Sequence, residues 1–413
     1  MAARLAIPPV AVLDALGAPE YRRLWLVGLC LNIARWIDLL ALGWLALTLT
    51  GSPLMVGVAA FCRTVPQLAL GPFGGVLADR LPSARLLLGS QALALAAGLA
   101  LVTGFATGRA GYWTLVGLEL VLGAAWALDF PVRRTVLFAL VGQARVTNAI
   151  SLETVSMQIG KMVGPVLGGV LLGRYGAPGC YAALVLLYVV ALALTLGLAP
   201  RIPARVKPAA PEPLALLAGA REVWARPTIR GVLVITVIMN VLVFPYQQML
   251  PVFARDVLRI GPELLGVLVA ADGLGALVAA LVVAANRGFG LHAQLFAGGS
   301  MAAAGLLLGF AASPWYGLSL ALLLLVGVAE SGFATMQSAL VLLSAPAETR
   351  GRAMGILSAC IGTGPFGTLW IGLIATHAGA PLATAACCVL ALVLITPMAL
   401  RLLGGPGLPE QRR

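Results

Sequence analysis

Long apolar stretches alternate with short polar segments along the whole chain. Twelve of these stretches hold about 20 residues or more, enough at about 1.5 Å per helical residue to cross a hydrocarbon layer about 30 Å thick. They occupy most of the 413 residues, so the pattern predicts an all-α membrane protein of twelve transmembrane helices without a sizeable soluble domain. The predicted spans are residues 24–48, 54–78, 86–106, 112–131, 150–172, 179–199, 230–253, 263–285, 291–311, 315–342, 354–376 and 380–402.

The longest polar connection, residues 200–229, separates two sets of six spans and is rich in proline and basic residues. Each set contains a Gly-Pro pair that opens a glycine-rich run, Gly164-Pro165 in the first and Gly364-Pro365 in the second. Two repeated halves are typical of membrane folds that move solutes. We therefore predict two pseudo-symmetric six-helix bundles, residues 1–199 and 230–413, joined by a cytoplasmic linker, residues 200–229.

Composition and charge agree with a polytopic membrane protein. Apolar residues make up 61% of the chain and charged residues 10%, with a mean hydropathy of +1.00, whereas ordinary soluble domains carry about 25% charged residues. The net charge of +12 does not indicate a nucleic-acid partner, because the basic residues fall in alternating loops. With the N-terminus in the cytoplasm, 20 Arg and Lys residues lie on the cytoplasmic side and 4 on the other. The positive-inside rule therefore predicts a multi-pass protein with both termini in the cytoplasm.

The arginine, alanine and glycine usage is typical of a GC-rich bacterial genome, so we expect the bacterial inner membrane. The six cysteines lie in or beside apolar runs without metal-ligand spacing, and we predict neither a metal site nor a cofactor. An enzyme should show a nucleophile–base set, a metal-ligand cluster or a phosphate-binding loop. None is present in the sequence, so we expect no catalytic residues.

Charged residues inside the spans are the strongest candidates for a functional pathway. A charge at bilayer depth costs about 2.5–3.5 kcal/mol on insertion scales, so it normally faces a cavity or a partner. Spans 3, 6 and 9 carry no Asp, Glu, Lys or Arg and span 12 only Arg401, which predicts that these four face lipid. Tyr246 and Gln247, between Pro245 and Pro251, add hydrogen-bonding groups to span 7. The buried charges are Arg35, Asp38, Arg63, Glu119, Lys161, Asp272 and Glu330.

Asp38 and Arg63 are predicted to form an ion pair. Span 1 runs outward and span 2 inward, and the two residues lie at the same depth, roughly 15 Å from the outer surface. Arg35, one turn before Asp38, could share its carboxylate. The pair has two readings, a static structural contact and a gate or proton-linked switch.

Two loop and helix motifs carry a family resemblance. Gly74-Gly75-Val76-Leu77-Ala78-Asp79-Arg80 ends span 2, and Arg85 follows in the short loop. Gly75, Asp79, Arg80 and Arg85 resemble the loop between spans 2 and 3 of major facilitator superfamily transporters. Span 5 contains Gly160-Lys161-Met162-Val163-Gly164-Pro165-Val166-Leu167-Gly168-Gly169, whose small residues at every fourth position favour close helix packing. The fixed positions Gly160, Gly164, Pro165, Gly168 and Gly169 resemble the motif that marks exporters among the drug/proton antiporters of the superfamily.

Further segments, among them Asp129-Phe130-Pro131-Val132-Arg133, resemble a bacterial branch that includes enterobactin and macrolide exporters. The resemblance implies a monomeric secondary transporter that exports small amphipathic organic molecules, drug-like or siderophore-like, by alternating access. A metabolite importer of the same fold is the alternative. A membrane-embedded sensor is a third possibility, although the 413 residues leave no room for a soluble output domain.

Protons are the expected coupling ion, because no ATP-binding motif is present. Four buried carboxylates are available, and desolvation favours the neutral form of an unpaired acid. Asp38 has cations nearby on its own and the next span, whereas Glu119 and Glu330 have none within four positions on theirs. We therefore expect Glu119 or Glu330 to carry the proton, with Lys161 able to approach Glu119 from span 5. The expected partners are a small-molecule substrate, protons and the lipid bilayer.

Overall fold

The computed structural model describes residues 14–203, 224–285, 292–346 and 349–404, and their side chains except those of 71–80, 143, 144, 147, 283–285 and 404. The described residues are almost entirely helical and contain no strand, which confirms the predicted all-α class. The elements are η2 (Asp14–Gly17), α1 (Pro19–Thr50), α2 (Pro53–Arg80), α3 (Ser83–Ala106), α4 (Tyr112–Leu198), η3 (Ala199–Arg201), α6 (Pro227–Ile238), η4 (Met239–Val243), α7 (Tyr246–Val252), η5 (Phe253–Val257), α8 (Pro262–Ala285), α9 (His292–Ala311), α10 (Tyr316–Ser344), α11 (Arg350–Ile361) and α12 (Gly364–Gly404).

Among the described residues, ten helical segments are long and apolar enough to cross a membrane, where the sequence pattern predicts twelve. Two of them, Asn148–Arg201 and Arg350–Leu403, are 54 residues long, more than twice the length that one crossing needs. The backbone leaves helical geometry inside each, at Gly176 (φ 64°, ψ −166°) and Gly379 (φ 82°, ψ 157°). Both angles lie in the left-handed region that glycine adopts without strain.

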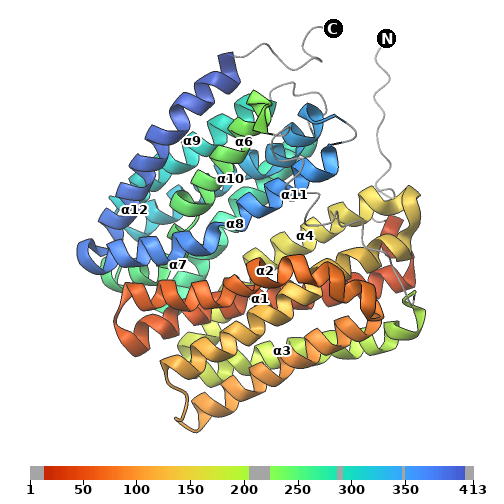
Figure 1. Ribbon diagram of the computed structural model, residues 1–413. Coiled ribbons are helices and arrows are strands. Elements are labelled where there is room, and N and C mark those ends of the chain that lie inside the picture. Colours follow the sequence, from red (N-terminus) through yellow and green to blue (C-terminus); the bar gives the residue numbers. More distant parts are fainter. Residues whose placement is uncertain (1–13, 204–223, 286–291, 347–348, 405–413) are drawn as a thin grey trace.

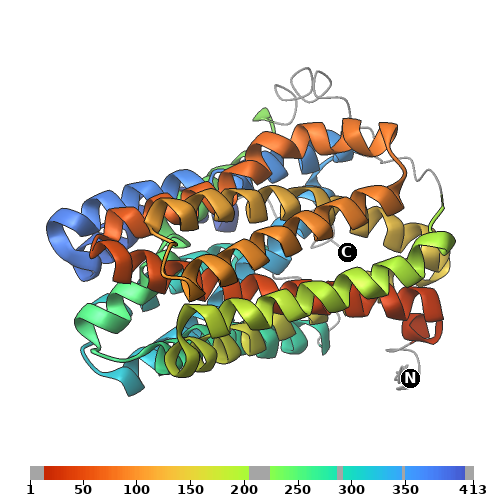
Figure 2. The same cartoon turned by 90° about the horizontal axis from the view of Figure 1, so that it is seen from below.

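The helices form two groups that lie side by side (Figure 1). One group contains α1 to α4 and the other contains α6 to α12, and the long axes of the helices run in similar directions when seen from below (Figure 2). Most of the predicted linker, residues 204–223, lies outside the described residues. The two groups meet along their facing helices, so any site between them is built from both.

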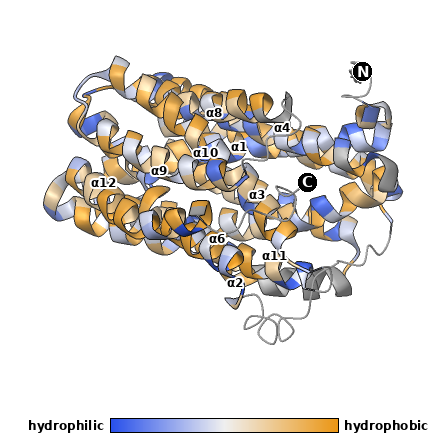
Figure 3. Cartoon of the chain, turned by 90° about the horizontal axis from the view of Figure 1, so that it is seen from above, coloured by the Kyte–Doolittle hydropathy of each residue, from blue (hydrophilic) through white to orange (hydrophobic). Residues whose placement is uncertain are grey.

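Apolar residues predominate along the long helices (Figure 3). Large apolar side chains point away from the protein on the segments that the sequence assigns to lipid, as at Leu99 of α3, Leu196 of α4 and Leu382 of α12. On α9 the exposed positions after Gln294 are all small, among them Ala302 and Gly305. In water such surfaces would be unfavourable, whereas a bilayer accommodates them.

Segment 227–257 is the least regular of the membrane-capable helices. Wider π-helical turns occupy Met239–Val243 and Phe253–Val257, on either side of the short α7. Pro245 precedes α7 and Pro251 lies inside it, and a proline removes a backbone donor from the helical ladder. Such local breaks in a membrane helix are tolerated where they line a cavity.

Candidate functional site

Three buried charged residues from three segments meet inside the α1–α4 group. Arg63 of α2 places its Nε atom 2.9 Å from Asp38 Oδ2 of α1 and 3.1 Å from Glu119 Oε2 of α4. Asp38 and Glu119 are fully buried and Arg63 is 4% exposed. The close approach of α2 and α4 depends on Gly123, because a Cβ atom there would collide with the Arg63 carbonyl oxygen. We call Asp38, Arg63 and Glu119 the arginine triad.

Arg35 does not share the Asp38 carboxylate, contrary to the expectation from helical spacing. Its guanidinium lies over the ring of Trp126, 4.4 Å from the centroid, and forms no ion pair with a described carboxylate. Trp126 in turn stacks on Phe130, with the ring centroids 5.6 Å apart. Arg63 reaches Asp38 from a facing helix, and the Trp126 ring offers Arg35 a cation–π partner instead.

A second cluster joins the two helix groups. Lys161 of α4 places Nζ 2.8 Å from Asp272 Oδ2 of α8 and 3.9 Å from Glu330 Oε2 of α10. Gln247 of α7 donates from Nε2 to Asp272 Oδ2 over 3.4 Å. Tyr246 is fully buried, and its hydroxyl interacts electrostatically with Asp272 and Glu330. We call Lys161, Asp272 and Glu330 the lysine triad.

These contacts correct three expectations about the carboxylates. Lys161 does not approach Glu119, because it reaches across to α8 and α10. Glu119 is paired with Arg63, and Glu330 has Lys161 at 3.9 Å, so neither lacks a cation. The expectation counted basic residues along one helix only, and here the partner comes from a different helix in both cases.

The glycines of span 5 let two helices approach α4 at once. A Cβ at Gly160 or Gly164 would lie within 2.8 Å of Asn32 or Trp36 of α1, and Gly168 faces Ile37. Gly169 lies on another face, directly against the Pro262 carbonyl of α8. Pro165, whose carbonyl lies against Gly266 of α8, is buried between these contacts. The motif therefore fixes Lys161, beside Gly160, at the junction of α1, α4 and α8.

At the end of the bundle near Gly51 the two groups also touch directly. Arg255 of η5 donates from Nη1 to the Leu47 carbonyl over 3.1 Å, and the Leu54 amide donates to Thr376 Oγ1 over 3.1 Å. Gly57 of α2 lies against the Thr368 carbonyl of α12. Within the described residues, the hydrogen bonds between the groups all lie between this end and the lysine triad.

A cavity opens between α1, α7 and α8, beside the lysine triad. It encloses about 520 Å³ of atom-free space, including the part that opens to solvent. Its wall is largely apolar, with a few convergent polar groups, as in small-molecule sites generally. The lining residues are Trp36, Leu39, Leu40, Gln247, Gln248, Leu250, Pro251, Leu265, Val269 and Asp272.

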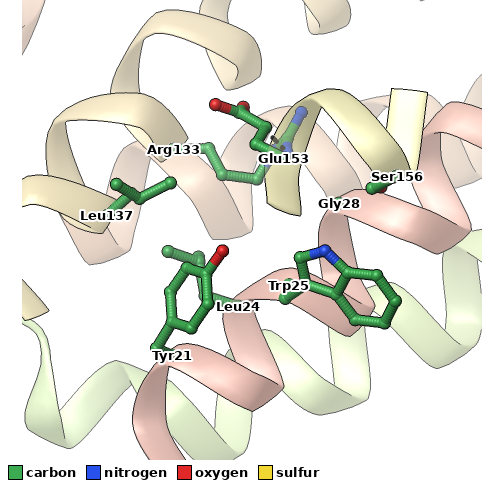
Figure 4. A pocket seen from close by; sticks show the side chains of 8 residues that line it. All are labelled: Tyr21, Leu24, Trp25, Gly28, Arg133, Leu137, Glu153 and Ser156. Atoms are coloured by element: carbon green, nitrogen blue, oxygen red, sulfur yellow. Dashed lines mark ion pairs between the residues drawn. The ribbon is translucent and has the colours of Figure 1, made fainter. Parts of the chain in front are cut away.

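A third ionic network, which the sequence analysis did not identify, joins two parts of α4 next to α1. Arg133 lies 3.1 Å from Asp129 and 3.6 Å from Glu153, and a small pocket beside it is lined by Tyr21 and Trp25 (Figure 4). Tyr21 and Trp25 donate to backbone carbonyls of α4 over 2.9 and 2.8 Å. The spacing of Asp129 and Arg133, four residues apart, was the available signal. Because the ionic contacts hold two parts of α4 together and the Tyr21 and Trp25 hydrogen bonds tie α1 to them, this network supports the fold.

Most side chains of the motif between spans 2 and 3, Gly75, Asp79, Arg80 and Arg85, lie outside the described part of the structure. The side chains of Asp79 and Arg80, and the surroundings of Gly75, lie outside the described residues, while Arg85 is exposed on α3. Among the side chains that the structure describes, no group of three His, Cys, Asp or Glu residues could hold a metal ion.

Comparison with known proteins agrees with this architecture. The sequence model of the family described as transmembrane secretion effector matches residues 11–405. The chain is 26% identical to the staphyloferrin A transporter of Staphylococcus aureus over 263 residues, which cover 61% of this chain and 64% of that transporter, so the match spans less than two thirds of the relative. It is 27% identical to the multidrug efflux pump Tap of Mycolicibacterium fortuitum over 368 residues, 83% of this chain and 86% of the pump.

Solved structures of similar fold include a bacterial homolog of the human lysosomal transporter Spinster in an inward-facing, unoccupied conformation. It has a TM-score of 0.68 at 14% identity and covers 96% of this chain and 98% of its own. A POT family transporter in complex with 5-aminolevulinic acid has a TM-score of 0.72 at 11% identity and covers 94% and 96%. At these identities the likeness establishes the fold.

Proposed function

We propose that this chain, which belongs to the transmembrane secretion effector family of the major facilitator superfamily, is a proton-coupled exporter of small amphipathic organic molecules. The chain is a multi-pass membrane transporter and not an enzyme. Its relatives include a siderophore transporter and a multidrug efflux pump, and the name of the pump and the family's description as a secretion effector support export as the direction. Drug-like and siderophore-like cargoes are therefore the two substrate classes that we propose.

The single observation that carries proton coupling is the charge balance of the two triads. Each holds two buried carboxylates against one cation in direct contact with them, Arg63 in one and Lys161 in the other. Arg35 also interacts electrostatically with Asp38, so the excess negative charge is clearest in the lysine triad. A buried charge without a full counter-charge is unfavourable in a membrane protein. Binding one proton at Glu119 or Glu330 would neutralise the excess, which makes these two residues the proposed proton sites.

We propose twelve spans in two bundles, residues 1–199 and 230–413, acting as one monomer. The breaks at Gly176 and Gly379 support this count, because each divides a 54-residue run into two pieces long enough to cross. The two bundles would rock against each other around the central cavity, as in alternating access.

We further propose that both termini and the 200–229 segment face the cytoplasm of a bacterial inner membrane. In intact cells a membrane-impermeant maleimide should then label a cysteine placed at Arg109, between α3 and α4, in a variant without the native cysteines. A cysteine placed at Arg413 should react only after the cells are permeabilised. Labelling of Arg413→Cys in intact cells would contradict the proposed orientation and place the C-terminus outside the cytoplasm.

With that orientation, the contacts around Gly57 and Arg255 close the outer side of the transporter. Gly169→Leu should disfavour this closed state, because the new side chain would collide with the Pro262 carbonyl of α8. The impermeant maleimide should therefore label Gln248→Cys in the cavity faster when Gly169→Leu is present. Gly117→Leu is the matched control, since a side chain there meets open space. An unchanged labelling rate would show that the Gly169 contact does not hold the outer side closed.

Dye efflux tests the proposed function directly. Cells that produce the protein should hold less of a fluorescent amphiphilic dye than cells with an empty vector. A protonophore should abolish the difference, because the proton gradient drives export in this proposal. Faster accumulation of dye would favour the importer of the same fold, and a difference that survives the protonophore would remove protons as the coupling ion.

A further inference from the structure

We propose that the Lys161 ammonium occupies the binding position of a substrate cation. The exported molecules would then be organic monocations with an apolar or aromatic body, held by Asp272 and Trp36 after Lys161 has been displaced. This inference rests on the proposed export function and names its substrate class.

The geometry around the ammonium is that of a cation site. Lys161 Nζ lies 2.8 Å from Asp272 Oδ2 and 5.7 Å from the centroid of the Trp36 ring. A carboxylate together with an aromatic face binds ammonium groups and delocalised organic cations. Asp272 and Trp36 both line the cavity between α1, α7 and α8, so a ligand in the cavity would meet the same two groups.

Three buried polar groups lie close to one another beside the ammonium, because the Tyr246 hydroxyl interacts with both Asp272 and Glu330. Among the described residues, no hydrogen bond reaches Asp272 Oδ1, Glu330 Oε1 or the Tyr246 hydroxyl, although all three are buried. Asp272 is 2% exposed and Glu330 is 7% exposed. Buried polar atoms nearly always have a hydrogen-bond partner in folded proteins, so these acceptor atoms are available to a further donor or cation.

The charges of the lysine triad favour a cation over an anion. Without substrate, two carboxylates face one ammonium, which leaves one excess negative charge. When a monocation binds Asp272, Lys161 keeps Glu330 as its partner and the cluster becomes neutral. An anion in the cavity would lie beside Asp272, and the excess negative charge of the cluster would rise from one to two. A proton and an organic cation thus compensate the same charge, which accounts for their exchange.

The two triads differ in how easily their cation can be displaced. Arg63 contacts both of its carboxylates through Nε and is 4% exposed, and it does not line the cavity. Lys161 carries a point charge on a flexible four-carbon stem. It also crosses from one helix group to the other, so its release from Asp272 would loosen the contact between the groups when substrate binds.

The test is equilibrium binding of two probes of the same shape and opposite charge to the purified chain in detergent. Tetraphenylphosphonium should bind at least roughly tenfold more tightly than tetraphenylborate. Asp272→Asn should weaken phosphonium binding by at least roughly tenfold, and Lys161→Met should leave it unchanged or tighten it. Asp14→Asn, an exposed carboxylate of η2 paired with Arg145, is the matched control and should bind like the unaltered chain.

The double variant Lys161→Met/Asp272→Asn controls for misfolding. It removes both members of the 2.8 Å ion pair, so neither charge is left buried without its partner. It should keep the elution profile of the unaltered chain and lose phosphonium binding. Preferential binding of the borate, loss of phosphonium binding in Lys161→Met alone, or full binding in Asp272→Asn would each overturn the proposal. Because no proton gradient is present, binding decides the substrate class separately from the efflux assay. Expected binding without gradient-driven efflux would keep this site and remove the proposed coupling.

Discussion

Replacing Arg63 by Met should abolish transport and lower the free energy of unfolding by about 3–5 kcal/mol, the expected cost of leaving buried charges unpaired. The effect is large because one guanidinium serves two carboxylates, Asp38 and Glu119, both fully buried. Urea unfolding of the purified chain in detergent, together with dye efflux in cells, would measure both losses.

Arg35→Met is the matched control, since Arg35 comes from the same helix group, stacks on Trp126 and forms no ion pair with a described carboxylate, although it lies in the electrostatic field of Asp38. Loss of a cation–π contact costs about 0.5–2 kcal/mol, so this variant should fold and remain measurable. Equal destabilisation by Arg35→Met and Arg63→Met would contradict the claim that Arg63 neutralises Asp38 and Glu119.

A second substitution tests whether Asp38 and Arg63 act as a pair. Adding Asp38→Asn to Arg63→Met removes one of the two stranded carboxylates, so the double variant should be less impaired than the sum of the two single losses. Recovery should be partial, because Glu119 is still present. Strict additivity would mean that the 2.9 Å contact contributes nothing.

The membrane-spanning helices and the Asp38–Arg63 contact could be predicted because both follow from the positions of residues along consecutive apolar stretches. Apolar length sets the span, and alternating direction sets the depth of each residue. The same count places Lys161 and Asp272 at matching depth in spans 5 and 8. That pair was not predicted, because hydropathy does not show which spans of the two halves are neighbours.

Side-chain partners within one helix were the least predictable feature. The spacing of one helical turn predicts a contact between Arg35 and Asp38. It cannot show that Arg35 stacks on the Trp126 ring, or that Arg63 from another helix pairs with Asp38. The number of separate helices was difficult for a related reason. At Gly176 and Gly379 single glycines break the helical backbone within otherwise continuous helical runs. The apolar pattern detects the polar residues of a loop, but it does not detect a change in backbone angles at one glycine.

Glu330→Gln should reduce gradient-driven dye efflux by at least roughly tenfold, which corresponds to about 1.4 kcal/mol of lost coupling. An amide cannot gain or lose the proton, and it leaves Lys161 with Asp272 as a neutral pair at 2.8 Å. The lysine triad would then have no excess negative charge that a proton from outside could neutralise, while movement of dye down its own gradient should persist. Glu119→Gln makes the corresponding test in the arginine triad, where Arg63 would be left with Asp38.

Glu20→Gln, a partly exposed carboxylate that pairs with Arg201 at 3.7 Å, is the matched control and should export dye normally. Surface pairs of this kind contribute about 0–1 kcal/mol, so folding should be unaffected. Comparing gradient-driven with downhill movement in the same cells separates loss of coupling from loss of the whole transporter. If Glu330→Gln and Glu119→Gln both keep gradient-driven efflux, the proton is carried elsewhere. If only one of them loses it, that triad holds the coupling site, and the other triad's two carboxylates serve to hold its helices together.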